Sequence, residues 1–391
     1  MKYFIKTFGC YANEVDSDVM AGILNSLGFS ELKLPKLRNE TEEVKHILEN
    51  ADLFIVNTCS VRQKSEDKVY GVVRMLKRNE GKKALTILAG CMVGSAKGDR
   101  KRYKLSSVKE KAKGFDFYIG PNDIYSLPSI LLDSGLIETL EGFDSSSAQR
   151  RQVDKNHAYI NVSYGCDNFC SYCVVPYSRG KEVTRSEKEI LEEIKCLVNL
   201  GVSEITLCGQ NVNSWGLDRA TKFKLRSGGN QKLPFVSLLK KVHKVKGVKK
   251  IDFMSSNPFD FTKDLVEVLK LPKVSNYFHI AVQSGNNAVL KAMRRRHTIE
   301  EFLSLVEEIR KVRPDAEFGT DIIVGFPGET KEQFMDTVEL FKKVRFSVAF
   351  ISMYSEREGT RSQKNLKDNV SLEEKKWRHG CLTKVWKKYK P

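Results

Sequence analysis

The densest group of chemically reactive side chains is a run of three cysteines, Cys166, Cys170 and Cys173, in the segment YGCDNFCSYCVVPYSRG. No His or Cys follows at an interval that would complete the usual four-ligand zinc site. Three thiolates on one loop instead suit a cubane iron–sulfur cluster, whose fourth iron stays open to a substrate or cofactor. A zinc knuckle with a remote fourth ligand is the alternative interpretation.

A second set of three cysteines is dispersed along the first third of the chain. Cys10, Cys59 and Cys91 each come one to three residues after a segment with the pattern of a strand. Parallel strands end at the same edge of a sheet, so these thiols are expected to converge there. With no His nearby, they indicate an iron–sulfur cluster or a zinc site with one open position. Three buried cysteines that pack as small apolar side chains are the alternative.

The remaining cysteines carry no such pattern. Cys196 lies among apolar residues of a predicted helix and Cys208 closes an apolar strand, so both are expected in the core, while Cys381 lies in a basic segment. The 391 residues hold nine cysteines but no apolar run of membrane-spanning length and no signal-peptide pattern. These features predict a cytoplasmic protein with reduced thiols, and they favour metal-binding or catalytic cysteines over a disulfide framework.

The cysteines of the dispersed set belong to a region that alternates between strands and helices. Strands are expected at 3–8, 52–57, 84–90 and 114–120, and helical spacing of apolar residues lies between them. This alternation predicts an open parallel α/β sheet over residues 1–140. The polar stretch 141–156 that follows is interpreted as a linker.

The alternation resumes after the linker and continues over residues 157–370. It predicts an incomplete (β/α)6 barrel, whose active site would lie at the carboxyl ends of the strands. The expected helices are at 187–200, 234–245, 262–270, 298–312 and 331–344, and the expected strands are at 158–163, 203–208, 249–254, 276–282, 317–324 and 346–353.

Positive charge is concentrated in three stretches. Lys and Arg number 66 against 49 Asp and Glu, a formal net charge of +17. Most of this excess lies in residues 97–113, 217–232 and 371–391, where apolar periodicity is weak. The first two are interpreted as insertions and the third as a basic C-terminal tail. Such stretches indicate nucleic-acid binding, with solvated lysine-rich loops as the alternative.

The cysteine spacing 166–170–173, with Tyr172 before the last cysteine, resembles the radical S-adenosylmethionine superfamily. Together with Cys10, Cys59 and Cys91 it is similar to the methylthiotransferase family, in particular to the branch that acts on N6-isopentenyladenosine at position 37 of tRNA. The resemblance extends over TFGC (7–10), NTCSVR (57–62), AGCM (89–92), CDNFCSYCVVPYSRGKEVTR (166–185), GQNVNS (209–214), VQSG (282–285), DIIVGFPGET (321–330) and YSEREGT (354–360).

This resemblance implies two [4Fe-4S] clusters and S-adenosylmethionine as cofactors. Cys166, Cys170 and Cys173 would hold the radical-generating cluster, and Cys10, Cys59 and Cys91 the auxiliary cluster that carries sulfur. Arg179 and Arg185 are expected to bind the cofactor carboxylate or RNA phosphate, or to be solvated. The residues expected to face S-adenosylmethionine at the barrel mouth are Tyr172, Gly209, Gln210, Ser255, Ser256, Asn257, Gln283, Ser284, Asp321, Ile323 and Gly325.

The same resemblance implies an enzyme that adds a methylthio group to carbon 2 of the adenine. Its implied partners are tRNA, a flavodoxin-like or ferredoxin-like electron donor and a sulfur or cluster-assembly donor, with no membrane and a monomer by default. Methylthiotransferases acting on N6-threonylcarbamoyladenosine or on a ribosomal-protein aspartate are alternatives. A non-catalytic iron–sulfur RNA-binding protein is the alternative from another class.

Two departures from the family pattern are visible. Tyr11-Ala12 stands where the family usually has Gln-Met, so a contact of that glutamine is lost. The chain ends at KVWKKYKP, where the family's small β-rich RNA-binding domain would begin, so that domain is expected to be absent.

Overall fold

A computed structural model describes residues 1–79, 83–143, 150–151, 154–218, 220–222 and 232–391. The chain divides into two compact units. Unit 1 consists of Met1–Val153 and Val174–Lys181, and unit 2 consists of Asp154–Cys173 and Glu182–Pro391. The segment 174–181, expected within the barrel, therefore packs with the N-terminal unit.

Unit 1 is a doubly wound α/β sheet. Its elements in chain order are β1 (Lys2–Phe8), α1 (Tyr11–Ser26), β2 (Ser30–Glu31), α2 (Glu40–Asn50), β3 (Leu53–Thr58), α3 (Gln63–Arg78), β4 (Leu85–Gly90), α4 (Cys91–Gly94), α5 (Leu105–Lys111), β5 (Phe117–Ile119), η1 (Pro121–Ser126), α6 (Leu127–Asp133) and α7 (Val175–Ser178). The described strands pair in parallel in the order β2-β1-β3-β4-β5. The open parallel sheet expected from the sequence is confirmed.

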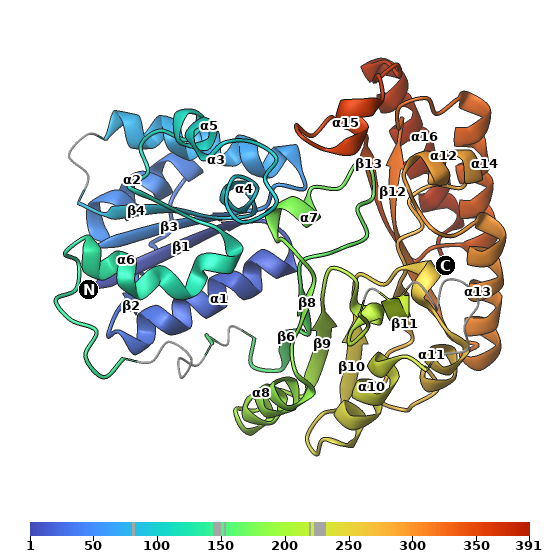
Figure 1. Ribbon diagram of the computed structural model, residues 1–391, viewed down its shortest axis with the longest axis horizontal. Helices are drawn as coiled ribbons and strands as arrows, with labels where there is room; N and C mark the ends of the chain where they lie inside the picture. Colours follow the sequence, from blue (N-terminus) through green and yellow to red (C-terminus); the bar gives the residue numbers. More distant parts are fainter. Residues whose placement is uncertain (80–82, 144–149, 152–153, 219, 223–231) are drawn as a thin grey trace. The chain divides into compact units, whose positions relative to one another are not determined.

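Both faces of this sheet are covered, which explains its almost wholly apolar central strands. Helices α1 and α6 pack on one face, and α2, α3 and α5 pack on the other (Figure 1). All six residues of β3 are buried. Strand β2 and helix α2 were not expected from the sequence, although Asn39 is a regular N-cap whose side chain accepts from the Glu42 backbone N–H.

Unit 2 is the incomplete barrel. Its elements are β6 (His157–Asn161), β7 (Ser163–Tyr164), β8 (Val183–Thr184), α8 (Glu187–Asn199), β9 (Glu204–Cys208), η3 (Val212–Ser214), α10 (Pro234–Lys244), β10 (Lys250–Phe253), η4 (Pro258–Asp260), α11 (Lys263–Val268), β11 (Tyr277–His279), α12 (Asn287–Ala292), α13 (Ile299–Val312), β12 (Glu317–Val324), α14 (Lys331–Val344), β13 (Val348–Met353), α15 (Arg361–Asn365) and α16 (Leu372–Tyr389).

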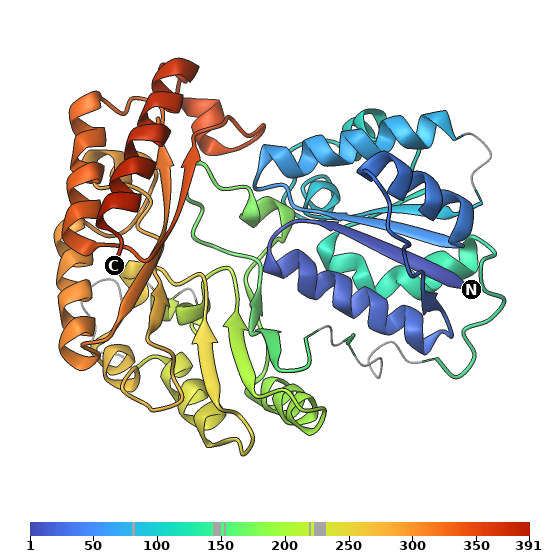
Figure 2. The same cartoon turned by 180° about the vertical axis from the view of Figure 1, so that it is seen from behind.

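The barrel strands run parallel in two sheets, β6-β9-β10 and β11-β12-β13. Isolated bridges such as Ile251↔Val274 and Ser256↔Ile280 connect the two sheets into one curved wall. The helices pack outside this wall, with one apolar core between helices and strands (Figure 2). The predicted (β/α)6 arrangement is confirmed, and strong capping boxes at Ser186, Thr298 and Thr330 explain why the long helices were predictable.

The basic stretches differ from the expectation of insertions and a tail. Residues 372–389 form α16, an 18-residue helix that packs on α14 and β13. Its Lys375 and Arg378 are buried in ion pairs with Asp368 and Glu329, so these cations serve the fold. Part of 97–113 forms α5, and Lys222 pairs with Glu182, while 219 and 223–231 lie outside the described residues. Some of the cations that were expected to bind nucleic acid are therefore paired with carboxylates of the chain itself.

Within the described parts of the chain, no helix is both long enough and apolar enough to span a bilayer.

Candidate cluster and cofactor sites

The three cysteines of unit 1 lie at the carboxyl ends of adjacent parallel strands. Cys10 is the N-cap of α1, Cys59 directly follows β3, and Cys91 is the first residue of α4 after β4. Strand order reverses between β1 and β3, and open α/β sheets bind ligands at such a switch point. The structure thus brings together the dispersed cysteines, and the Cys10 and Cys91 sulfurs each hydrogen-bond to Cys59.

These contacts make two of the three thiols acidic. The hydrogen bond from Cys59 lowers the pKa of Cys10 to about 7. The same kind of bond, assisted by the charge of Arg179, lowers the pKa of Cys91 well below its ordinary value. Cys59 donates to both neighbours, so its own pKa is raised well above the ordinary value. A buried, electron-rich sulfur set of this kind fits a metal cluster bound through thiolates.

A buried ion pair borders this sulfur set. Arg179 is 4% exposed, and its Nη2 donates to Asp16 Oδ2 at 2.6 Å. Burial raises the pKa of Asp16 to about 6, although Arg179 acts in the opposite direction. The expectation that Arg179 binds a cofactor carboxylate or RNA phosphate is wrong, because Asp16 occupies its guanidinium.

Arg185 is also held internally. Its Nη1 donates to Glu193 Oε2 at 2.6 Å and to the Asn161 carbonyl at 2.8 Å. The expectation for this arginine is therefore wrong as well, since strand β6 and helix α8 supply its acceptors.

A layer of buried amides supports the cysteines of unit 1. Asn57 Nδ2 donates to the Asn13 carbonyl at 2.8 Å and to Ser17 Oγ at 2.9 Å. Asn13 Nδ2 in turn donates to Asn57 Oδ1 at 3.2 Å. Gly90 has φ +97°, and a Cβ there would lie 2.3 Å from Asn57 Oδ1, so only glycine lets Cys91 begin α4 at this place.

The three cysteines of unit 2 occupy one loop between β7 and β8. The antiparallel pairing of Ser163–Tyr164 with Val183–Thr184 closes the base of this loop. Within it, the Cys173 N–H donates to the Cys170 carbonyl at 3.0 Å. Ser171 fastens the loop to the end of α12, because its N–H donates to the Met293 carbonyl at 3.0 Å and its Oγ to the Ala292 carbonyl at 2.9 Å.

Cys166 and Cys170 have contrasting surroundings. Burial raises the pKa of Cys166 well above its ordinary value, and charge on Cys173 and Cys170 acts in the same direction. Cys170 accepts a hydrogen bond from Arg295 Nη1 at 3.5 Å. Three thiols on one loop of this kind fit a cluster in which each sulfur binds a different iron. No three His, Cys, Asp or Glu side chains of the described residues are arranged around a single metal ion.

Two buried hydroxyls at strand ends have no hydrogen-bond partner among the described residues. They are Ser256 Oγ, after β10, and Ser163 Oγ, in β7. Buried hydroxyls are normally paired, so such orphans indicate donors held for a ligand. A Cβ at Gly209 would lie 2.6 Å from Ser163 Oγ, which explains the glycine at the end of β9. This edge of the barrel fits a polar cofactor such as S-adenosylmethionine.

Other residues expected at the barrel mouth lie on the same edge. Tyr172 and Ile323 pack on an apolar cluster that contains Met293, Phe326 and Tyr354. Gln283 has φ +77° and Ser255 φ +68°, so both strand ends carry backbone strain of the kind found at binding sites. Ser284 is fully buried, Asn257 and Gly325 are buried, and Gln210 is half-buried.

Asp321 has a partner inside the barrel. Its Oδ2 lies 2.8 Å from His279 Nε2, and His279 Nδ1 lies 3.0 Å from the Tyr277 hydroxyl. A Cβ at Gly319 would lie 2.0 Å from the Tyr277 oxygen, so glycine makes room for this chain of side chains. His279 is the satisfied, buried histidine that the sequence analysis expected.

A buried polar network fixes the loops after β9 and β10. Asn211 Nδ2 donates to Asp260 Oδ2 at 3.2 Å, and Ser214 donates to the same oxygen. Asn213 donates to the Asn257 carbonyl at 2.9 Å. The GQNVNS motif therefore holds the loops that carry Gly209 and Ser256, an explanation that its sequence alone did not supply.

Arg295, Asp16 and the amide layer were not expected from the sequence. The run Arg294-Arg295-Arg296-His297 contains one buried arginine between two exposed ones, and nothing in its spacing distinguishes the three. Among the other cysteines, Cys208 is buried as expected. Cys196 is exposed, so its expected core position is wrong, because α8 turns Ile190, Ile194 and Leu197 inward instead.

Comparison with known proteins agrees with this geometry. The radical SAM superfamily model matches residues 160–341, and a model described as uncharacterized protein family UPF0004 matches residues 2–112. A tRNA-2-methylthio-N(6)-dimethylallyladenosine synthase of Thermotoga petrophila is 38% identical over 99% of this chain and 82% of its own length. The synthase of the same name from Protochlamydia amoebophila is 39% identical over 92% of this chain and 75% of its own.

The chain belongs to the tRNA-2-methylthio-N(6)-dimethylallyladenosine synthase family. Solved structures share the fold of this synthase-family chain at low identity. The radical S-adenosylmethionine methyltransferase TsrM of Kitasatospora setae, solved with cobalamin and a [4Fe-4S] cluster, superimposes with a TM-score of 0.61 at 14% identity over 93% of this chain and 74% of its own. The cobalamin-dependent radical enzyme OxsB gives a TM-score of 0.55 at 11% identity over 100% of this chain and 57% of its own.

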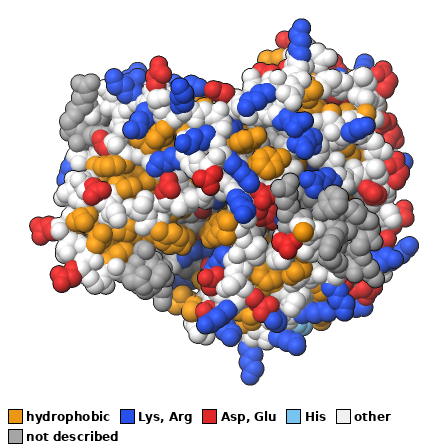
Figure 3. Space-filling view, in the orientation of Figure 1, with side chains coloured by type: hydrophobic (Ala, Val, Ile, Leu, Met, Phe, Trp, Pro, Cys, Tyr) orange, Lys and Arg blue, Asp and Glu red, His pale blue; other side chains and the backbone are white. Residues whose placement is uncertain are grey.

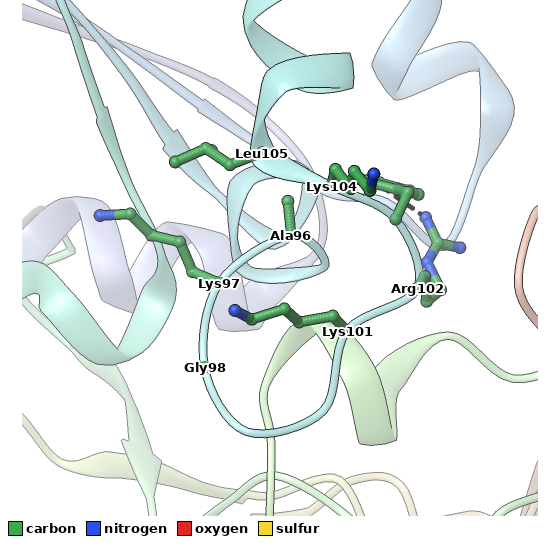
Figure 4. Close-up of a pocket in the computed structure, with 8 residues that line it drawn as sticks. Ala96, Lys97, Gly98, Lys101, Arg102, Lys104 and Leu105 are labelled. Carbon is green, nitrogen blue, oxygen red and sulfur yellow. Dashed lines mark hydrogen bonds between the residues drawn. The ribbon is translucent and has the colours of Figure 1, made fainter.

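The synthase-family chain also has a basic pocket in unit 1. The loop after α4 borders a shallow, open pocket of about 460 Å³, lined by Ala96, Lys97, Gly98, Lys101, Arg102, Tyr103, Lys104 and Leu105. Lys97 and Lys101 extend to one side of this loop, and Lys104 and Arg102 lie at the other (Figure 4). Elsewhere on the face in Figure 3, Lys and Arg are interspersed with Asp and Glu. The loop is thus a local concentration of positive charge that suits an anionic ligand.

Proposed function

We propose that this chain adds a methylthio group to carbon 2 of N6-isopentenyladenosine at position 37 of tRNA. The observation that carries the proposal is the presence of two separate three-thiol sites, one at the carboxyl ends of parallel strands in unit 1 and one on the loop between β7 and β8 in unit 2. A reaction that both generates a radical and transfers sulfur needs two such sites, whereas radical generation alone needs one.

In unit 2, Cys166, Cys170 and Cys173 would hold the radical-generating cluster. With S-adenosylmethionine bound, that cluster supplies a 5′-deoxyadenosyl radical able to remove hydrogen from carbon 2. The orphan hydroxyls of Ser163 and Ser256 would donate hydrogen bonds to the cofactor. Tyr172 and Ile323 would pack against its apolar parts, and Gly209, Gln210, Gln283, Ser284 and Asp321 would complete the mouth. These side chains bind and orient the cofactor and exclude water.

In unit 1, Cys10, Cys59 and Cys91 would hold the auxiliary cluster that carries the sulfur to be transferred. The Arg179–Asp16 pair closes the buried side of this site without adding net charge. Buried Asn13 and Asn57 fix the positions of α1 and β3, on which two of the cysteines depend. The chain's own contribution is to hold the three thiols close together at the edge of the sheet.

The partners are part of the proposal. The basic loop 96–105 supports tRNA as substrate through contacts with phosphate. A flavodoxin-like or ferredoxin-like protein would supply electrons, and a separate donor would replace the transferred sulfur. We place the reaction in the cytoplasm, where tRNA is modified, and treat the chain as a monomer.

The test is mass spectrometry of tRNA nucleosides from cells that lack their own adenosine-37 methylthiotransferase, with and without this chain. The 2-methylthio derivative of N6-isopentenyladenosine is expected only when the chain is expressed. A Cys170→Ala variant, expressed to the same level, is the matched control and should give none.

Two other outcomes would change the proposal. Appearance of the 2-methylthio derivative of N6-threonylcarbamoyladenosine instead would move the substrate to the neighbouring branch. No change in either nucleoside, with both clusters present in the purified chain, would contradict a tRNA substrate and favour a methylthiolated ribosomal-protein aspartate, which the same cells would reveal by peptide mass.

A further inference from the structure

One buried arginine of unit 2 touches a cysteine of the proposed radical-generating site and has no acidic partner among the described residues. Arg295 is 9% exposed, and its Nη1 donates to Cys170 Sγ at 3.5 Å. Its Nη2 donates to the carbonyl of Ala281, which lies between β11 and Gln283, at 2.6 Å. No Asp or Glu of the described residues pairs with it, and its Nε has no hydrogen-bond partner among them. A buried cation usually has a carboxylate partner, so this arrangement calls for another explanation.

An aromatic ring holds the guanidinium on its other side. Arg295 lies over the Phe259 ring at 5.2 Å, and the His297 ring stacks on Phe259 with centroids 6.1 Å apart. Burial, together with the charge of Arg295, lowers the pKa of His297 to about 3, so this imidazole is neutral. Of Arg295, Phe259 and His297, Arg295 therefore carries the positive charge, and Phe259 contributes a cation–π contact that stabilises it.

Backbone geometry fixes where this charge lies. The Arg295 N–H donates to the Leu290 carbonyl at 2.8 Å, and Arg294 adopts φ +57° to end α12. The same helix end accepts both hydrogen bonds of Ser171, which stands between Cys170 and Cys173. The cysteine loop and Arg295 are thus both held by the end of α12, so the fold sets the distance between Cys170 and the guanidinium.

We propose that Arg295 is a positioning residue that orients the Cys170 thiolate and raises the reduction potential of the cluster bound there. This inference rests on the proposed function only in assigning a cluster to Cys170. Hydrogen bonds to ligand sulfur and nearby charge are the main protein controls on cluster potential. Reduction adds one electron from a low-potential donor, and a cation beside the sulfur favours that more negative state.

The experiment uses the full chain with Cys10, Cys59 and Cys91 changed to Ala, so that the unit 2 cluster alone is titrated. Its midpoint potential is measured by electron paramagnetic resonance during reduction with dithionite, and iron content is measured in parallel. Arg295→Met is expected to lower the ratio of reduced to oxidised cluster at a fixed potential by about tenfold, or 59 mV for one electron. Arg295→Lys keeps the charge and should stay within about threefold of the parent.

Arg294→Met is the matched control, because Arg294 is the exposed neighbour in the same segment, and it should leave the potential unchanged. An unchanged potential in Arg295→Met with the cluster retained would overturn the inference. So would loss of the cluster in both Arg295→Met and Arg295→Lys, since a purely structural guanidinium would then be required. The titration uses no tRNA. The shift in midpoint potential can therefore be observed when the nucleoside assay fails, and the nucleoside assay can succeed when no shift is observed.

Discussion

Each three-cysteine site has a buried arginine beside a sulfur, but in the part of the chain that the structure describes only the arginine of unit 1 has a carboxylate partner. Arg179 lies against Cys91 and Cys10 and forms an ion pair with Asp16, so the net charge there is zero. Arg295 contacts Cys170, a carbonyl and an aromatic ring instead. Two sites with the same number of thiols therefore offer different electrostatic environments.

This difference corresponds to the two roles proposed for the sites. A site that binds and releases an anionic sulfur ligand would hold that ligand too tightly beside an unpaired cation, and Asp16 prevents this. A site that must accept an electron gains from a cation, because positive charge stabilises the reduced state. The charge of each site is therefore set by the side chains around the cysteines, which are Arg179 and Asp16 in unit 1 and Arg295 in unit 2.

The largest expected effect comes from removing the unit 1 cation. Arg179→Met leaves the Asp16 carboxylate buried and unpaired, which should lower the free energy of unfolding of cluster-free unit 1 by about 3–5 kcal/mol. Hydrogen exchange of β1, β3 and β4 measures this unit, because all three tryptophans, Trp215, Trp377 and Trp386, belong to unit 2. The double variant Asp16→Asn/Arg179→Met should recover most of the loss. Equal instability of both variants would show that an unpaired Asp16 carboxylate is not the cause.

Asp16 of unit 1 and His297 of unit 2 should respond to pH in opposite directions. Burial raises the folded-state pKa of Asp16 from 3.8 to about 6, so its contribution to stability is full below pH about 4 and is lost as pH rises through about 6. The pKa of His297 is lowered from 6.5 to about 3, so its contribution is full above pH about 6.5 and is lost as pH falls towards 3.

Between pH 6.5 and 4.5, His297 should cost unit 2 about 2 kcal/mol of unfolding free energy. Urea unfolding followed by tryptophan fluorescence measures this loss in the cluster-free chain. His297→Phe keeps the ring on Phe259 and should reduce the acid dependence by that amount. An unaltered dependence would show that His297 is not the responsible group.

Glu329, next to Gly325 at the barrel mouth, should also destabilise its unit when its arginine partner is removed. Arg378 of α16 donates to Glu329 Oε2 at 2.8 Å, and Glu329 accepts from the Gly325 N–H at 2.6 Å. Arg378→Met leaves that carboxylate buried, so unit 2 should lose about 3 kcal/mol in tryptophan-monitored unfolding. Lys384→Met, on an exposed position of the same helix, is the control and should change stability by less than about 0.5 kcal/mol.

The smallest effects concern surface charge. Lys101→Ala/Lys104→Ala removes two exposed cations of the basic loop of unit 1. The slope of log affinity against log salt for an anticodon stem-loop should fall by about 1 to 2. Lys384→Ala/Lys387→Ala on α16 should leave the slope unchanged; the opposite result would assign RNA binding to unit 2.

The sequence predicted both sheets because strand position and cysteine position are local properties. Cys10, Cys59 and Cys91 each end a strand, and parallel pairing alone then makes them neighbours. Helix α16 was not predictable in this way, because its buried face includes Lys375 and Arg378, and a pattern of apolar residues cannot reveal buried ion pairs.

The charged side chains beside the cysteines could not be predicted from the sequence, for a related reason. Arg179 and Asp16 are 163 residues apart, and Arg295 and Cys170 are 125 apart. Only the fold decides which of the many arginines in this basic chain is buried beside sulfur. Arg179 and Arg185, which were expected to bind a ligand, pair with Asp16 and Glu193. No role was expected for Arg295.

The measurement that tests the account most directly compares one cysteine from each site. Reconstituted Cys59→Ala and Cys170→Ala are supplied with dithionite, S-adenosylmethionine and isopentenylated tRNA, and both 5′-deoxyadenosine and the methylthio nucleoside are quantified by mass spectrometry. The account predicts that Cys170→Ala releases neither product, whereas Cys59→Ala still releases 5′-deoxyadenosine and forms no methylthio nucleoside. Loss of 5′-deoxyadenosine from both variants would contradict a division of labour between the two sites.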